Sequence, residues 1–184
     1  MDYEKLTKWV KVSYRKVRRN EQTYRATEEF FTAEISRLVK AYPACPDIQS
    51  QRLIRDSIDF CLRRAHNYSI REKIGAHYTQ VGLQGERTFE HLVPAAAIRD
   101  LLLNDVMPVR YALNAPTVLL SSSNDGKLRR AGLVSSSGNL FYPFKRYLSA
   151  GIEDQFETSK GDRITNLDAW SLRDHYELIF GSTA

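Results

Sequence analysis

The segment from Arg87 to Leu133 contains the residue types that acid–base and metal chemistry require. Glu90 and His91 form an acid–histidine pair, Asn114 follows further along, and a polar cluster spans 121–125. A carboxylate can bind a divalent cation through oxygen, and a neutral imidazole can accept a proton near pH 7. This is the one stretch of the chain in which a metal-binding acid and a proton acceptor could converge.

A short strand must carry the acid–histidine pair. Residues 87–93 alternate weakly between polar and apolar and include the β-forming residues Thr88, Phe89 and Val93. Pro94 ends the run because it cannot extend a ladder. We therefore expect a strand that ends in Glu90-His91.

The downstream elements are a helical insert, a second strand and a helix. Residues 94–103 are typical of a helix opened by proline, and a second short helix or turn covers 108–113. A β-like run at 116–120 follows. The polar residues 121–126 then supply capping side chains for a helix over 127–132.

This order of elements and these residues resemble the ββα-metal, or HNH, endonuclease family. In that family an acid–histidine pair on a first strand faces ligands at the start of a helix that follows a second strand. The resemblance implies that Glu90 is a metal ligand, that His91 is the general base and that Asn114 orients it. It also implies that Asp125 or Asn124 is the last metal ligand.

The resemblance covers about a quarter of the chain and departs from the family pattern in three ways. Glu90 stands where Asp or His is commoner, the final histidine of the pattern is absent, and no paired cysteines are present for a structural zinc. These departures affect the ligand assignments more than the assignment of His91 as the base.

Hydrolysis of a phosphodiester explains why such residues would lie together. The reaction needs a deprotonated water and a charge that stabilises the leaving oxygen. A neutral His91 would supply the first, and one Mg²⁺ or Mn²⁺ bound by oxygen ligands would supply the second. An alternative interpretation assigns no chemistry here: His91 is a strand histidine, Glu90 a surface acid, and Ser121–Asp125 an ordinary turn and N-cap.

Composition indicates a folded protein without a membrane segment. The chain has 184 residues, of which 42% are hydrophobic and 11% aromatic. Two cysteines without metal spacing are typical of reduced thiols, which predicts a cytoplasmic protein. No apolar run approaches the roughly 20 residues of a membrane helix, and the N-terminus lacks a signal-peptide pattern.

Positive charge is concentrated in the N-terminal part. Residues 1–80 have 16 basic and 10 acidic side chains, a balance of +6, whereas residues 81–184 have 11 and 12, a balance of −1. Basic residues interleaved with Trp9, Tyr14 and Tyr24 are typical of phosphate and base contacts. The residues proposed to bind nucleic acid in this region are Lys11, Arg15, Arg18 and Arg19. A solvated helix face is the alternative.

Hydrophobic periodicity predicts helices on both sides of the central segment. Three are expected before it, over 3–19, 27–41 and 47–66, with Thr27 capping the second. After it we expect a short strand at 140–143, a helical turn at 144–150 and a helix over 166–180. His175 is expected at the surface, and neither His66 nor His77 is assigned to the site.

These observations predict an α+β protein with a basic helical region (1–80) and a ββα-metal core (81–184) that includes a helical insert and a C-terminal helix. The predicted function is that of a metal-dependent endonuclease acting on DNA, with RNA also possible. Arg129 and Arg130 are expected to contact the phosphates. The main alternative is a protein that binds nucleic acid through its basic helices without cleaving it, and a protein-interaction module is a third. The sequence leaves the oligomeric state open.

Overall fold

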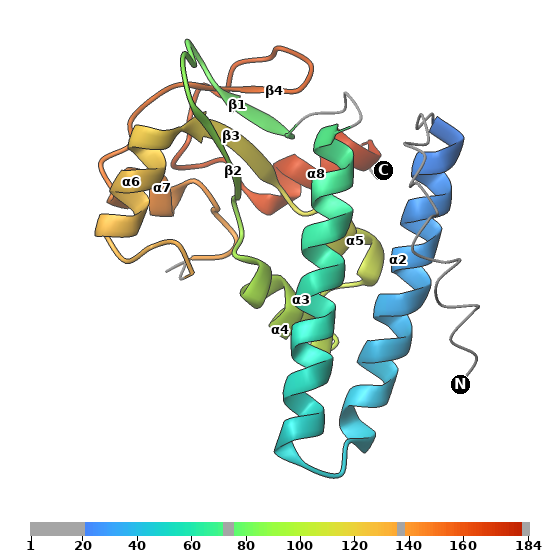
Figure 1. Cartoon of the computed structure of the whole chain (residues 1–184). Coiled ribbons are helices and arrows are strands. Elements are labelled where there is room, and N and C mark those ends of the chain that lie inside the picture. The colour runs from blue at the N-terminus through green and yellow to red at the C-terminus, as the bar shows by residue number, and fades with distance from the viewer. Residues whose placement is uncertain (1–20, 72–75, 136–138, 182–184) are drawn as a thin grey trace, which may run out of the picture.

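The computed structural model describes residues 21–71, 76–135 and 139–181, and it shows an α+β protein in which a helical hairpin packs beside a small mixed sheet (Figure 1). The helix expected over residues 3–19 lies outside the described residues, as do Lys11, Arg15, Arg18 and Arg19. Among the described residues, none of the helices has the length and apolar character needed to cross a membrane.

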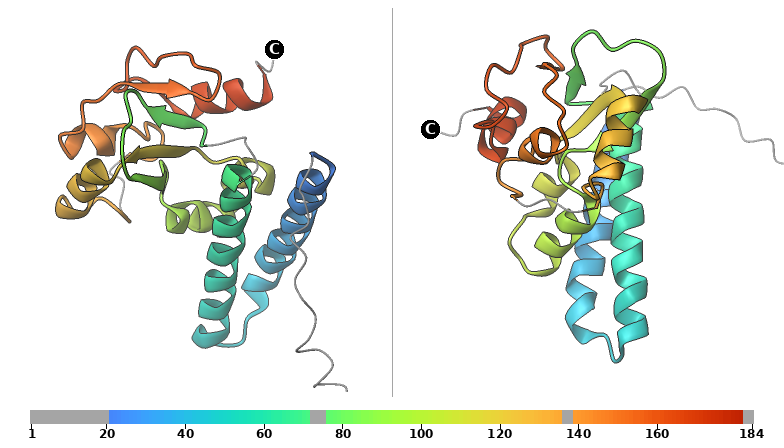
Figure 2. Two further views of the ribbon diagram at one scale, coloured as in Figure 1. Left: turned by 45° about the horizontal axis from the view of Figure 1, so that its top comes forward. Right: turned by 90° about the vertical axis from the view of Figure 1, so that its left-hand side faces the viewer.

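The hairpin consists of α2 (Glu21–Ala41) and α3 (Ile48–Arg71), joined through the 3-10 helix η1 (Tyr42–Ala44). Asp47 begins α3, because its Oδ1 accepts the backbone N–H groups of Gln49 and Ser50, both at 2.8 Å. The hairpin extends away from the sheet, and its turn lies far from the strands (Figures 1 and 2). Both helices were expected, but α2 begins earlier than predicted, so Thr27 lies inside the helix and does not cap it.

Two short helices lie between the second and third strands along the chain. The helices α4 (Ala95–Leu103) and α5 (Val109–Leu113) both follow a proline and pack against the hairpin. Apolar side chains of all four helices form one buried cluster, which includes Ile35, Ile58, Leu62, Ile98 and Ala112. The insert predicted between the two central strands is thus helical, and it joins those strands to the N-terminal hairpin.

The sheet has four strands in the order β2-β3-β1-β4. They are β1 (Tyr78–Gln80), β2 (Arg87–His91), β3 (Thr117–Ser121) and β4 (Phe156–Thr158). Strands β2 and β3 are antiparallel, β1 and β3 are parallel, and β4 is antiparallel to β1. Among the described residues β2 pairs only with β3, so it is an edge strand of this sheet.

The helix α6 (Ser122–Arg130) follows β3 directly and contacts both β2 and β3. Ser121 caps it by accepting the backbone N–H of Asn124. Leu128 of α6 joins the second buried cluster, which contains Val118 and Leu120 of β3 and residues near α7 (Lys145–Ser149). The last helix, α8 (Leu172–Phe180), begins at a capping box between Ser171 and Asp174.

Further features differ from the sequence expectations. The helices α6 and α8 begin at Ser122 and Leu172, whereas helices were expected over 127–132 and 166–180. The strand expected at 140–143 is a turn, in which the Asn139 side chain accepts the backbone N–H groups of Phe141 and Tyr142. Strands β1 and β4 were not expected, since three residues are too few for a periodic pattern. The predicted boundary at residue 80 follows β1, which already belongs to the sheet.

Candidate active site at the edge strand

The side chains of Glu90 and His91 lie on opposite faces of β2. Glu90 is paired in register with Val118, which belongs to the buried cluster beneath α6, so Glu90 shares that face of the sheet. His91 is paired with Thr117 and extends toward α3. The pair therefore straddles the edge strand, as alternating strand side chains must.

Glu90 forms a buried ion pair with Arg146 of α7. The Arg146 Nη2 atom lies 2.7 Å from Glu90 Oε1, and the Arg146 side chain has no exposed surface. The same guanidinium donates to the backbone carbonyls of Leu133, Val134 and His91. Burial raises the pKa of Glu90, and the positive charge of Arg146 opposes that shift.

Asp125 lies in the first turn of α6, beside Glu90. Its Oδ2 atom accepts from Nε of Arg129 at 2.7 Å. Its Oδ1 atom is buried and has no hydrogen-bond partner within the described residues. The two carboxylates interact, because the charge of Asp125 contributes to raising the pKa of Glu90. The structure thus brings together the two acids that the sequence assigned to the site.

Asn124 is directed elsewhere. Its Nδ2 atom donates to Gln80 Oε1 at 3.1 Å and to Asp154 Oδ2 at 2.8 Å. Gln80 in turn donates to Asp154 and accepts the backbone N–H of Ser121. This cluster joins β1, the start of α6 and the segment before β4. Of the two alternatives at the helix start, Asp125 is the one that lies beside Glu90.

His91 contacts His66 rather than Asn114. The Nε2 atom of His91 lies 2.7 Å from Nδ1 of His66, whose own Nε2 lies 3.0 Å from the carbonyl oxygen of Ala112. Burial is the main cause that lowers the pKa of His91, and the positive charge of Arg63 adds to it. Burial also lowers the pKa of His66, to about 4, so both imidazoles are neutral near pH 7.

The prediction that Asn114 orients His91 is wrong. The Asn114 side chain donates to the carbonyl of Arg110 at 2.9 Å and reaches Glu28 Oε1 at 3.5 Å. The Asn114 side chain bonds the preceding turn because Asn114 ends α5, where the last carbonyls lack partners within the helix. His66 is the residue that contacts the His91 ring. No sequence signal pointed to it, since it is separated from His91 by 25 positions and lies on a different element.

The other two histidines, His77 and His175, contact the segment that connects α5 to β3. His77 Nδ1 accepts the backbone N–H of Thr117 at 3.2 Å. His175 contacts the carbonyl of Asn114 at 2.7 Å through Nε2 and the Tyr78 hydroxyl at 2.8 Å through Nδ1. The expectation that His175 lies at the surface is wrong, because its side chain is fully buried. Burial lowers the pKa of His77 to about 3 and that of His175 to about 4.

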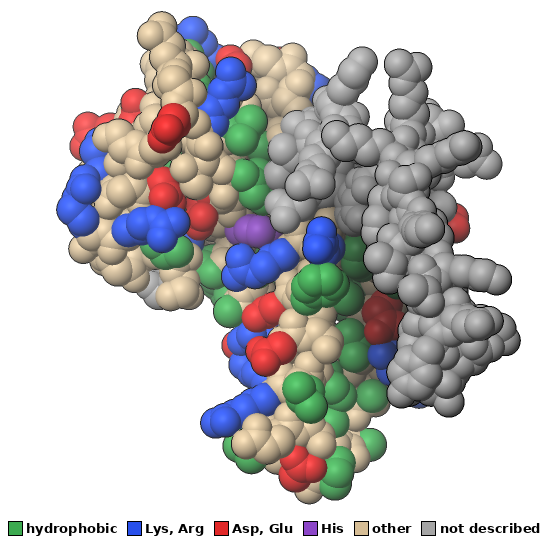
Figure 3. Space-filling model, in the orientation of Figure 1, with side chains coloured by type: hydrophobic (Ala, Val, Ile, Leu, Met, Phe, Trp, Pro, Cys, Tyr) green, Lys and Arg blue, Asp and Glu red, His purple; other side chains and the backbone are tan. Residues whose placement is uncertain are grey.

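The surface around this site carries both signs of charge. Figure 3 shows histidine at the surface between β2 and α3 with basic side chains beside it, and acidic and basic groups interspersed over α6. Arg129 is mostly exposed, although its guanidinium is paired with Asp125, and Arg130 is also exposed. Arg63 and Arg64 are exposed on α3.

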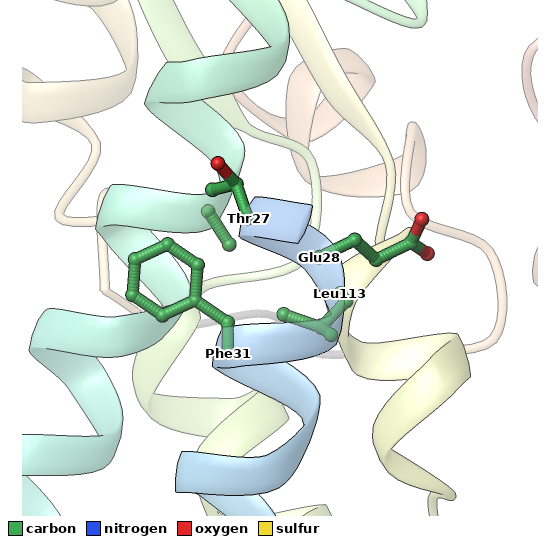
Figure 4. Close-up of a pocket in the computed structure, with 5 residues that line it drawn as sticks. Thr27, Glu28, Phe31 and Leu113 are labelled. Atoms are coloured by element: carbon green, nitrogen blue, oxygen red, sulfur yellow. The ribbon is translucent and has the colours of Figure 1, made fainter. Parts of the chain in front are cut away.

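A small pocket lies away from these residues, where α2, α3 and α5 meet. It is lined by Thr27, Glu28, Phe31, Ala65 and Leu113, and Glu28 extends away from Phe31 (Figure 4). Its lining is largely apolar and includes neither Glu90 nor His91. The predicted site residues therefore lie at the sheet edge and outside this pocket.

Within the part of the chain that the structure describes, no group of three or more His, Cys, Asp and Glu side chains could hold a metal ion. Glu90 and Asp125 are two carboxylates on neighbouring elements, since α6 contacts β2 and the charge of Asp125 acts on Glu90. Mg²⁺ at phosphate sites commonly takes one or two protein carboxylates and fills its other positions with water and substrate oxygens. The unpartnered Oδ1 of Asp125 fits such a site.

No protein-family model, curated protein sequence or solved structure matches the chain.

Proposed function

We propose that the protein is a metal-dependent endonuclease that hydrolyses phosphodiester bonds of DNA. One observation carries the proposal: the antiparallel pair β2–β3 and the helix α6 that directly follows bring Asp125 beside Glu90, with His91 on the same strand. This is the arrangement that the ββα-metal resemblance implies. Of these elements β3 and α6 are consecutive, whereas α4 and α5 separate β2 from β3 along the chain.

Glu90 and Asp125 are the residues that would hold Mg²⁺ or Mn²⁺. When bound, the cation would supply positive charge to the leaving oxygen of the phosphodiester. Arg146 binds one oxygen of Glu90, and Arg129 binds one oxygen of Asp125. These contacts fix the direction of the second oxygen of each carboxylate. Asn124 is not part of this ligand set, because its amide is used in the contact with Gln80 and Asp154.

His91 is proposed as the general base. Burial and the charge of Arg63 keep its imidazole neutral, so a lone pair is available for a proton from water. The imidazole is held by His66 and is therefore pre-oriented before substrate arrives.

The edge position of β2 makes the opposite orientations of Glu90 and His91 compatible with one substrate. Inside a sheet, groups on the two faces are separated by the neighbouring strands. At a free edge a phosphodiester backbone can lie along the strand and contact groups from both faces. The exposed basic residue Arg63 on α3 lies on the His91 side, where it can attract the phosphates.

A plasmid-nicking assay tests this function. We expect the purified protein to convert supercoiled DNA to the nicked form with Mg²⁺ or Mn²⁺ and to lose this activity with EDTA. DNA binding without cleavage under any of these conditions would contradict the proposal and support the alternative of a protein that only binds nucleic acid. Replacement of DNA by RNA in the same assay separates the two substrates.

A further inference from the structure

The direction of each hydrogen bond in the His91–His66–Ala112 series follows from its last member. A backbone carbonyl can only accept, so His66 must carry its proton on Nε2. In a neutral imidazole the other nitrogen is then the acceptor, which makes Nδ1 of His66 the acceptor toward His91. His91 must therefore donate from Nε2.

This assignment leaves the lone pair of His91 on Nδ1. Within the described residues the ring of His91 makes no further hydrogen bond, so this nitrogen is not occupied by a protein donor. The centroids of the two rings lie 4.8 Å apart, the ring planes make an angle of 54°, and His66 is only 2% exposed. Water therefore cannot replace His66 as the partner of His91 without local opening.

We infer that His66 is the positioning residue of the site: it holds His91 in the Nε2–H tautomer and thereby makes Nδ1 the atom that accepts the proton. The inference rests on the proposed function, since it assigns the proton-accepting atom of the same base. His66 acts through His91 and does not touch the substrate. Its own orientation is set by Ala112, so the packing of α3 against α5 determines the tautomer at the end of β2.

The direct test is the nitrogen NMR spectrum of the imidazole rings. In the wild-type protein we expect His91 to show a protonated Nε2 and an unprotonated Nδ1. A His91 ring protonated on Nδ1 would overturn the inference at once, whether or not any variant folds.

Two substitutions at position 66 separate positioning from packing. In His66→Gln the side-chain amide can still donate to the Ala112 carbonyl and accept from His91, so the His91 tautomer and kcat should stay close to wild type. His66→Leu removes the acceptor, so His91 should populate both tautomers. We then expect kcat to fall by roughly 10- to 100-fold with KM little changed, by analogy with the loss that follows when the partner of a metal-bound histidine is removed.

His175 offers a matched control. It is equally buried and also bonds one carbonyl and one side-chain group, but it contacts Tyr78 and Asn114 instead of His91. His175→Leu should lower the melting temperature as His66→Leu does, and it should leave the His91 tautomer and kcat unchanged. An equal loss of kcat in both Leu variants would overturn the inference and indicate a general loss of structure.

Failure of the inference can be told apart from failure of the proposed function. If the protein does not cleave DNA but the tautomer of His91 depends on residue 66, the endonuclease function is wrong and the positioning contact stands. If cleavage requires His91 but His66→Leu changes neither tautomer nor kcat, the function stands and the inference is overturned.

Discussion

Arg146 and Glu90 form an ion pair at 2.7 Å in which the arginine side chain is completely buried and the glutamate side chain is 15% exposed. Removing one partner of such a pair leaves an uncompensated charge in a poorly solvated place, which commonly costs about 3–5 kcal/mol. The pair also links α7 to the edge strand. It is therefore both a structural contact and part of the candidate site.

Replacement of Arg146 by Met should lower the free energy of unfolding by about 3 kcal/mol or more, measured by urea denaturation. The additional change Glu90→Gln should recover part of this loss, since no buried charge remains. Arg173→Met is the matched control, because Arg173 and Glu177 form an exposed pair and little change is expected. An equal change in the free energy of unfolding for both arginine substitutions would show that the buried pair stabilises the protein no more than the exposed pair does.

Replacement of His91 by Ala should abolish cleavage and leave DNA affinity within a few-fold of wild type, because a general base acts in the chemical step and not in phosphate binding. Nicking and filter binding measure the two properties separately. Circular dichroism must show that the variant is folded, since His91 is largely buried. Wild-type cleavage by a folded His91→Ala protein would exclude His91 as the base.

Replacement of Asp125 by Asn should weaken Mn²⁺ binding by roughly tenfold or more, as measured by electron paramagnetic resonance of the free ion. The change removes a negative charge and keeps the shape of the side chain. Asp168→Asn is the control, since Asp168 is exposed and is paired with Lys145 at 3.5 Å. An unchanged Mn²⁺ affinity in Asp125→Asn would remove Asp125 from the ligand set.

Stability should fall as the pH decreases from about 6.5 to about 4. The folded-state pKa values of His77 and His175 lie below the ordinary value of 6.5, at about 3 and about 4. The unfolded chain therefore binds more protons in this window, and acid favours unfolding by about 1.4 kcal/mol per pH unit for each such histidine. Urea denaturation at several pH values measures the slope, and His175→Gln should make it shallower. A slope unchanged by that substitution would show that His175 does not titrate as described.

Neutralisation of Lys11, Arg15, Arg18 and Arg19 should weaken DNA binding and flatten its salt dependence. Each lost phosphate contact should reduce the slope of log affinity against log salt by about 0.9. A protein in which the exposed residues Lys160 and Arg173 are neutralised provides the control from the C-terminal part. If both proteins keep the wild-type slope, the N-terminal residues are solvated and do not contact DNA.

The central elements were predictable because each has a local cause. Pro94 and Pro108 precede the two short helices, Asp47 caps α3, and the alternation of residues 87–93 marks β2. The order of these elements also led to the expectation that the start of α6 faces β2, and α6 does contact β2.

The remaining features depend on contacts between distant parts of the chain. Arg146 pairs with Glu90 across 56 positions, and His175 bonds Tyr78 across 97. A buried histidine and an exposed one have the same sequence signature, so burial of His175 could not be expected. The error at Asn114 has the same origin, because a side chain that ends a helix bonds the preceding turn first.

The parallel pairing of β1 with β3 has a consequence for the order of folding. Everything from residue 81 to residue 116, including the edge strand and both insert helices, lies between these two strands in the chain. Closing such a loop costs entropy before the pairing can return free energy, so non-local pairs of this kind form slowly. We expect the α2–α3 hairpin, which is built from local contacts, to form first and to serve as the surface on which α4 and α5 dock. The candidate site would then be among the last parts of the protein to assemble, and a nascent chain would acquire it only after β3 and α7 had been synthesised.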